Sequence, residues 1–188
     1  MKTYSQIGQD TFVLKLLGES GFFLDFGCGD GESYPCGNNT LLLEQHGWDG
    51  LSFDIDQNSI NKFNANRKTK AICSDLSVNL KDTLEKSNCP KLIDYFSFDV
   101  DEATDAVFDA FPFDEYQCRF ISFEHNLYLP EYRGLKERSQ EVFFNHGYKL
   151  LIDNVCFNGR PVEDWYFKFD EREFLGYNIE GIKTHELI

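Results

Sequence analysis

The sequence lacks the features that usually mark a nucleic-acid-binding or a membrane protein. It contains no run of Lys or Arg, and its 18 basic and 32 acidic residues give a formal net charge of −14. Phosphate backbones and anionic lipid headgroups are held mainly by cationic side chains, so we expect neither nucleic acid nor a membrane surface as a partner. No apolar run approaches the ~20 residues that a membrane-spanning helix needs.

The sequence also lacks any Cys-x-x-Cys pair among its six cysteines, which are Cys28, Cys36, Cys73, Cys89, Cys118 and Cys156. We expect reduced thiols packed as small apolar residues rather than a disulfide framework. The polar opening, residues 1–9, is not predicted to be a signal peptide. Together these observations predict a cytoplasmic protein.

What the chain has is enough apolar material for a core, because 41% of its 188 residues are hydrophobic and 19 are Phe. This length suits one domain, residues 1–188. Residues 1–20 form its predicted N-terminal segment, and residues 171–188 are expected to be a C-terminal tail. We find no internal repeat or linker in the sequence.

Short apolar runs alternate with helical stretches along the chain. This order is typical of an α/β fold with a mostly parallel sheet and helices on both faces. The turn Asn158-Gly159 predicts a late hairpin, whose last strand would be antiparallel. The predicted strands are 22–26, 51–55, 71–73, 92–100, 119–123, 148–155 and 164–169. The predicted helices are 8–18, 39–46 with an Asn39 N-cap and a Gly47 stop, 58–66, 78–87, 103–111 and 132–146.

The most informative motif is Gly27-Cys28-Gly29-Asp30-Gly31, which follows the first predicted strand directly. Glycines at such a turn let the backbone approach a ligand where a Cβ would clash. In open α/β sheets, ligands bind beyond the carboxyl ends of the strands. The motif therefore predicts a nucleotide-like cofactor in this loop.

Two cofactor classes fit a glycine turn in this position. A dinucleotide site usually shows Gly-x-Gly-x-x-Gly leading directly into a helix that faces the pyrophosphate. Here the third glycine comes one residue early, and the acidic Glu32 follows it. An acidic loop suits a cofactor with no phosphate and a positive sulfonium centre, which favours S-adenosyl-L-methionine over NAD.

Two later carboxylates support a nucleotide. Asp54 ends the second predicted strand, where it would accept hydrogen bonds from both ribose hydroxyls. Asp75 follows the third strand, close to the expected position of the adenine. Either carboxylate taken alone is equally well explained as a solvated strand end.

At this point the chain resembles the FkbM-type class I methyltransferases. The resemblance covers about residues 4–125, and a weaker similarity extends to Gly147-Tyr148 and to the residues around Trp165. It is carried by Tyr4-Ser5-Gln6-Ile7-Gly8-Gln9-Asp10, Leu24-Asp25-Phe26-Gly27-Cys28-Gly29-Asp30-Gly31, Asn39-Thr40-Leu41-Leu42-Leu43-Glu44, Gly47-Trp48-Asp49-Gly50-Leu51 and Asp94-Tyr95-Phe96-Ser97-Phe98-Asp99-Val100-Asp101.

The resemblance implies S-adenosyl-L-methionine-dependent methyl transfer on a Rossmann-like seven-stranded sheet. Members of this family commonly O-methylate a small molecule or a sugar, so the resemblance implies such an acceptor. It also implies that the segment from Gln6 to Asp10 closes over the cofactor. The cofactor-binding residues that it implies are Gln6, Asp25, Gly27, Gly29, Gly31, Asn39, Thr40, Asp54, Ile55, Asp75 and Asp99. The chain departs from the family at Asp54, Glu102, Thr104 and His125.

The acceptor side is predicted where the fourth and fifth strands end, at Asp99 and at Glu124-His125. Alcohol oxygens are poor nucleophiles, so O-methylation needs a base or a metal. His125, with an unperturbed pKa near ~6.5, is the expected base, and Asp99 and Glu124 complete the predicted catalytic set. An alternative is that Glu124 and His125 only satisfy nearby polar groups. Another is that the Asp, Glu and His groups hold a divalent cation, although no tight ligand spacing predicts a metal site.

Three functions stay open from the sequence. The first is a methyltransferase with a small-molecule or carbohydrate acceptor. The others are a nicotinamide-dependent oxidoreductase on a similar sheet and a methyltransferase-like domain that binds without turnover. The aromatic residues Tyr128, Tyr132, Trp165 and Tyr166 could stack on an acceptor, although packing is their expected role. The sequence predicts no oligomeric state.

Overall fold

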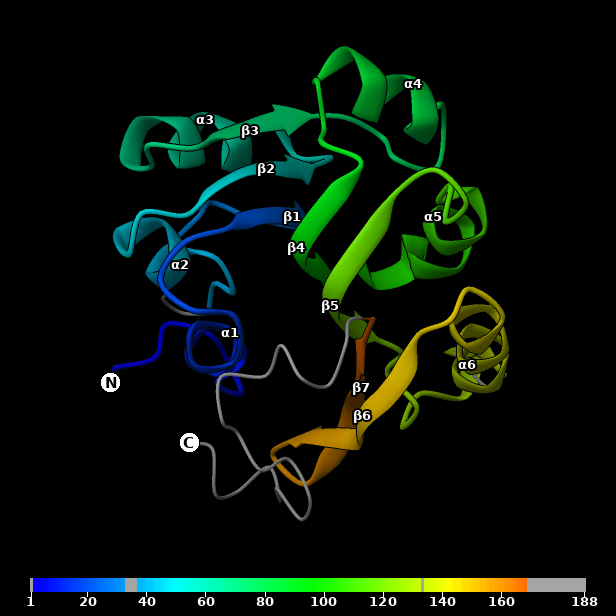
Figure 1. The fold of residues 1–188 in the computed structure, drawn as a ribbon. Helices are drawn as coiled ribbons and strands as arrows, with labels where there is room; N and C mark the ends of the chain where they lie inside the picture. The colour runs from blue at the N-terminus through cyan, green and yellow to red at the C-terminus, as the bar shows by residue number, and fades with distance from the viewer. Residues whose placement is uncertain (1, 33–36, 133, 169–188) are drawn as a thin grey trace.

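The computed structural model describes residues 2–32, 37–132 and 134–168. The predicted tail, residues 171–188, lies outside the described residues, as does Cys36. The fold is built on a seven-stranded sheet in the order β3-β2-β1-β4-β5-β7-β6 (Figure 1). Neighbouring strands from β3 to β5 are parallel, and β7 is antiparallel to both β5 and β6.

The strands are β1 (Phe22–Phe26), β2 (Asp49–Asp54), β3 (Lys70–Cys73), β4 (Leu92–Phe98), β5 (Gln117–Glu124), β6 (Lys149–Phe157) and β7 (Arg160–Phe167). The α-helices are α1 (Gln9–Leu17), α2 (Leu41–Gln45), α3 (Gln57–Asn66), α4 (Leu80–Lys86), α5 (Thr104–Ala110) and α6 (Leu135–Asn145). Two 3₁₀ turns, η1 (Asp101–Ala103) and η2 (Pro130–Tyr132), precede α5 and α6. Every predicted strand and helix is present, with boundaries that move by a few residues.

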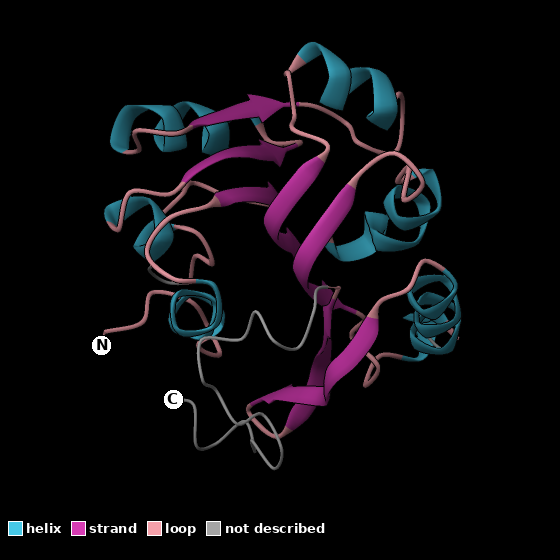
Figure 2. Ribbon diagram, in the orientation of Figure 1, coloured by secondary structure: helices cyan, strands magenta, loops and turns pink. Residues whose placement is uncertain are grey.

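Helices cover both faces of the sheet, with α1, α2 and α3 on one side and α4, α5 and α6 on the other (Figures 1 and 2). Strand side chains alternate between the faces. In β1, Phe23 packs into the cluster under α1 and α2, whereas Leu24 and Phe26 pack into the larger cluster under α4, α5 and α6. Many of the aromatic residues therefore pack into two buried clusters, one on each face of the sheet.

Two boundaries differ from the sequence prediction for clear local reasons. The N-cap of α2 is Thr40, not Asn39, and the first turn is held by Asn38, whose Oδ1 atom accepts the backbone N–H groups of Thr40 and Leu41. Strand β7 begins at Arg160, four residues earlier than expected. Phe157 pairs with Arg160, so Asn158-Gly159 is a two-residue turn, and both residues have the positive φ that such turns require.

Candidate cofactor and acceptor site

The register of the parallel strands brings four functional positions to one edge of the sheet. Phe26 pairs with Phe53 and with Phe98, and Phe98 pairs with Phe123. The next residue in each strand is therefore level with the others. These four residues are Gly27, Asp54, Asp99 and Glu124.

A cavity of about 760 Å³ lies at this edge. Its volume falls within the roughly 300–1,000 Å³ typical of small-molecule sites. Of the residues predicted to bind cofactor, nine line it: Gln6, Asp25, Gly27, Gly29, Asn39, Asp54, Ile55, Asp75 and Asp99. Gly31 and Thr40 are not among its lining residues.

The three glycines of the motif have different roles. A Cβ on Gly27 would lie 1.6 Å from the Asp99 carbonyl oxygen, so this glycine allows β1 and β4 to approach closely. A Cβ on Gly29 would meet nothing within 4 Å, so this position keeps space free in the cavity. A Cβ on Gly31 would lie 2.5 Å from the ring of Phe63, which makes Gly31 a packing residue rather than a ligand contact.

Asp25 is buried beneath the cavity and is held by a polar network. Thr40 Oγ1 donates a 3.0 Å hydrogen bond to Asp25 Oδ2, and Arg67 Nη2 donates to Thr40 Oγ1 at 3.2 Å. Burial raises the pKa of Asp25 to about 6, against the opposing effects of Thr40 and Arg67. Thr40 therefore acts through Asp25, and Asp25 is placed to pair with a cationic ligand.

Arg67 is a functional residue that the sequence analysis missed. Its side chain is 1% exposed, and its Nε atom lies 3.1 Å from Glu44 Oε1. Its Nη1 atom donates to Gly31 O and to Asn38 Oδ1, each at 3.1 Å. The guanidinium thus ties the glycine loop to the start of α2, and only the distant contacts made in the folded chain reveal this role.

The nucleoside end of the cavity is formed by β2 and β3. Asp54 already binds backbone, since Gly29 N donates to its Oδ2 at 2.9 Å and Asp56 N donates to its Oδ1 at 2.8 Å. Each carboxylate oxygen retains a second lone pair for a hydroxyl donor. Ile55 is a large apolar side chain that is 69% exposed at the cavity wall, where a flat ring could cover it. Asp75 is exposed and binds the backbone and hydroxyl of Ser77.

The N-terminal segment lies against the same cavity. Gln6 and Gln9 both line it, and Gln9 Nε2 donates a 2.8 Å hydrogen bond to Glu163 Oε1 on β7. Asn39 Nδ2 donates to Ser97 Oγ of β4 at 3.0 Å. Gln9 and Ser97 line the cavity although the sequence analysis did not single them out, because neither follows a strand end.

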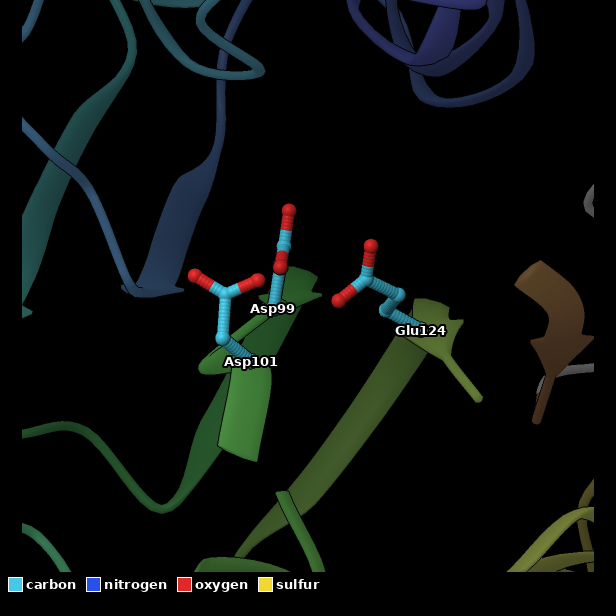
Figure 3. Close-up of side chains that lie close together, drawn as sticks. All are labelled: Asp99, Asp101 and Glu124. Atoms are coloured by element: carbon cyan, nitrogen blue, oxygen red, sulfur yellow. The ribbon is translucent and has the colours of Figure 1, made fainter. Parts of the chain in front are cut away.

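Three carboxyl groups converge where β4 and β5 end. Asp99, Asp101 and Glu124 point toward one another (Figure 3), with carboxyl oxygens within 4.8 Å of each other. Burial and then the neighbouring Asp99 raise the pKa of Glu124 far above its usual range. Burial also raises the pKa of Asp99. Two carboxyls placed so closely cannot both ionise readily, so they share a proton near neutral pH.

His125 does not reach the cavity, which contradicts its expected role as the base. Its side chain is 0% exposed. Its Nδ1 atom accepts a 3.1 Å hydrogen bond from Leu127 N, and its Nε2 atom lies 3.3 Å from Asp164 Oδ1. Both ring nitrogens are thus occupied within the protein. Of the predicted catalytic set, the structure brings Asp99 and Glu124 together and leaves His125 on the other side of β5.

The aromatic residues considered as stacking groups differ in their exposure. Trp165 and Tyr166 are both 0% exposed, so neither can stack on an acceptor. Trp165 Nε1 donates to Glu163 Oε2, and Tyr166 Oη donates to Asp164 Oδ2. Tyr128 is 40% exposed and lies under the guanidinium of Arg160, 5.2 Å from ring centroid to Arg160 Cζ.

The sheet order, the antiparallel β7 and the six flanking helices together define the Rossmann-like fold of class I methyltransferases. Solved structures of that class are similar to this chain over most of its length. Magnesium protoporphyrin IX methyltransferase from Synechocystis PCC 6803, with bound S-adenosylmethionine, has a TM-score of 0.59 and 12% identity; the match covers 87% of this chain and 79% of that one. Fibrillarin from Aeropyrum pernix, with natively bound S-adenosylmethionine, has a TM-score of 0.57 and 13% sequence identity; the match covers 88% of this chain and 75% of that one. A putative rRNA methylase from Clostridium thermocellum has a TM-score of 0.55 and 13% sequence identity; the match covers 90% of this chain and 100% of that one.

No protein-family model matches the sequence, and no curated protein is detectably similar to it in sequence. The likeness therefore establishes the fold, and the FkbM-type resemblance stays a prediction. Within the described part of the chain, no helix combines the length and apolar character needed to cross a membrane.

Proposed function

We propose that this protein is an S-adenosylmethionine-dependent methyltransferase that acts on a small molecule. The observation that carries the proposal is the arrangement at the sheet edge. One cavity is lined by Gly29, which leaves space open, by Asp54, which is held by backbone N–H groups, and by the buried Asp25. The carboxyl groups of Asp99, Asp101 and Glu124 line the same cavity beside them. Asp25 and Asp54 would hold the amino-acid and ribose ends of the cofactor, and Ile55 would cover the adenine.

The chemistry of the lining favours this cofactor over a dinucleotide. The cavity wall includes Asp30, within the glycine turn, and Glu32, directly after it, and among the described residues the next helix, α2, begins only at Leu41. A pyrophosphate at this place would meet carboxylates instead of helix N–H groups. S-adenosylmethionine would supply an electrophilic methyl group on a cationic sulfur, which an acidic wall attracts.

The expected hydroxyl or sugar acceptor depended on His125 as the base. Because His125 is occupied by Leu127 and Asp164, the groups available to an acceptor are Asp99, Asp101 and Glu124. Positioning of the acceptor beside the methyl group would supply most of the rate, and one of these carboxylates would take the acceptor proton.

The test is methyl transfer from isotopically labelled S-adenosylmethionine to a small-molecule extract of the source organism. We expect a labelled product with the native chain and much less at limiting donor concentration with Gly29→Ala, whose Cβ would extend into the cavity. Gly159→Ala, in an exposed turn with a similar positive φ, is the matched control and should keep activity. Binding of the donor without any labelled product would instead identify a binding domain.

A further inference from the structure

We infer that the acceptor is a small amine, that its ammonium group binds among Asp99, Asp101 and Glu124, and that its nitrogen receives the methyl group. This inference rests on the proposed function and names the substrate class of the same cavity. It is carried by two features: the charge of the cavity wall, and the convergence of three carboxyl groups that have no cationic partner among the described residues.

The cavity wall is acidic throughout. Nine of the described residues that line it carry carboxyl groups, and none of those described is Lys, Arg or His. Asp25, Asp54 and Asp75 belong to the cofactor end. The others remain for the acceptor end and the entrance: Asp30, Glu32, Asp99, Asp101, Glu102 and Glu124. An anionic acceptor would meet like charge along its whole path, whereas a cation would be attracted.

The three converging carboxyl groups have no cationic partner among the described residues. The charged groups that act on them are all acids: Asp54 and Glu102 on Asp101, and Glu163 on Glu124. One oxygen of Glu124, Oε2, is buried without a hydrogen-bond partner in the described structure. Asp101 is exposed and Asp99 and Glu124 are half-buried. Carboxyl groups partly withdrawn from water are normally paired, so this set favours a cationic ligand that arrives with hydrogen-bond donors.

The spacing admits an ammonium group. Three carboxylate oxygens that accept hydrogen bonds of about 2.8 Å from a tetrahedral nitrogen lie about 4.6 Å apart. One carboxyl oxygen from each of Asp99, Asp101 and Glu124 lies within 4.8 Å of the other two. The same limit admits a divalent cation, whose opposite ligand oxygens lie about 4.1 Å apart. The metal-dependence test below separates the two cations.

The reaction then balances without a further base. The Asp99–Glu124 pair holds one proton, so the carboxylate of the pair that is ionised takes a proton from the bound ammonium, and the freed nitrogen lone pair forms a bond to the methyl carbon. The bond between that carbon and sulfur breaks, and its electron pair stays on sulfur, which becomes a neutral thioether. Positive charge moves from sulfur to nitrogen, so the carboxylates stabilise the product as they did the substrate.

The experiment incubates the native chain with CD₃-labelled S-adenosylmethionine and a small-molecule extract, then separates products at pH 7 on cation- and anion-exchange resins. We expect the labelled product on the cation exchanger, with the CD₃ group on nitrogen by mass fragmentation. A neutral or anionic labelled product, or a label on oxygen, would overturn the inference and leave the proposed function intact. No labelled product in any fraction would contradict the proposed function itself.

Two controls make the assignment specific. Glu124→Gln should lower the rate by about 100-fold or more while calorimetry shows unchanged donor binding; an unchanged rate counts against the inference. Glu137→Gln, the same change at an exposed position on α6, should alter neither quantity. Activity that EDTA abolishes and Mg²⁺ restores would place a metal ion between the carboxyl groups and would also overturn the inference.

Discussion

Gly27 and Gly29 lie two residues apart in one turn but face different surroundings. Both have positive φ, at 80° and 56°. The Cβ of Gly27→Ala would collide with the Asp99 carbonyl oxygen, whereas the Cβ of Gly29→Ala would enter the cavity. The first glycine is thus required by the close approach of β1 and β4, whereas the second lines the cavity.

Substitution should separate these two roles. We expect Gly27→Ala to destabilise the fold by more than about 2 kcal/mol, and Gly29→Ala by about 1–2 kcal/mol from φ strain alone. Gly29→Ala should also weaken S-adenosylmethionine binding at least about tenfold. Urea unfolding and calorimetry measure the two effects. Equal losses of stability in Gly27→Ala and the turn control Gly159→Ala would contradict the account.

Asp25 should make donor binding depend on pH. Burial raises its pKa to about 6, and a cationic ligand favours the ionised carboxylate. Affinity should therefore be highest above pH 7 and fall as the pH drops through 6, by about tenfold between pH 7 and pH 5. Binding near pH 6 should release a proton, which calorimetry in two buffers of different ionisation enthalpy detects. In Asp25→Asn this dependence should shrink markedly; a profile identical to the native one would remove Asp25 from the site.

The two residues Glu124 and His125 show a limit of sequence reasoning at this scale. Both are polar residues at the end of β5, and consecutive strand residues point in opposite directions. The sequence does not say which of them faces the ligand. The pairing with β7 decides it, because His125 N and Asn126 N both donate to Val162 O and turn the ring toward Asp164.

Among the elements, the loop between β1 and α2 depends most on a single buried ion pair. Arg67, at the end of α3, binds Glu44 on α2 together with Gly31, Asn38 and Thr40. It connects three elements beneath the cavity. Removing one member of a buried pair costs roughly 3–5 kcal/mol, because the other charge is left without a partner.

We therefore expect Arg67→Met to lower the free energy of unfolding by about 3 kcal/mol, at the lower end because Glu44 keeps hydrogen bonds from Lys68 and Thr69. Chemical denaturation measures the change. The control is Lys86→Met, which removes an exposed 4.0 Å pair with Asp82 on α4 and should cost less than about 1 kcal/mol. Similar losses in both variants would show that the Arg67 network contributes no special stability.

Element positions were largely predictable because local patterns determine them. Strand β1 was predicted at its observed bounds, since five apolar or buried residues lie between two glycines. The Asn158-Gly159 hairpin was predicted from its turn residues. The contacts of Arg67 with Asn38 and of Gln9 with Glu163 were not predicted, because the partners lie 29 and 154 residues apart along the chain.

At the scale of the whole molecule, the strand order follows from a few general rules. Parallel strands separated by helices predict a doubly wound sheet, and a late hairpin predicts one antiparallel strand. The insertion of β7 between β5 and β6 brings Glu163 opposite Glu124. No local pattern predicts that pairing, and it adds to the acidity beside the cavity.

The net charge of −14 has a consistent role in this account. Acidic groups concentrate where a sulfonium cofactor and an amine acceptor would enter, and the cationic Arg67 lies beneath the site, bound to Glu44. The overall field of the molecule would favour encounter with cations and oppose anions.

The central claim is that this cavity holds S-adenosylmethionine rather than a dinucleotide. The most direct measurement is calorimetric titration of the full chain at pH 7.5 with S-adenosylmethionine and, separately, with NAD. The account predicts one S-adenosylmethionine bound per chain, at least about tenfold weaker in Gly29→Ala, and no heat of binding with NAD. Binding of NAD, or no binding of S-adenosylmethionine by the folded chain, would contradict it.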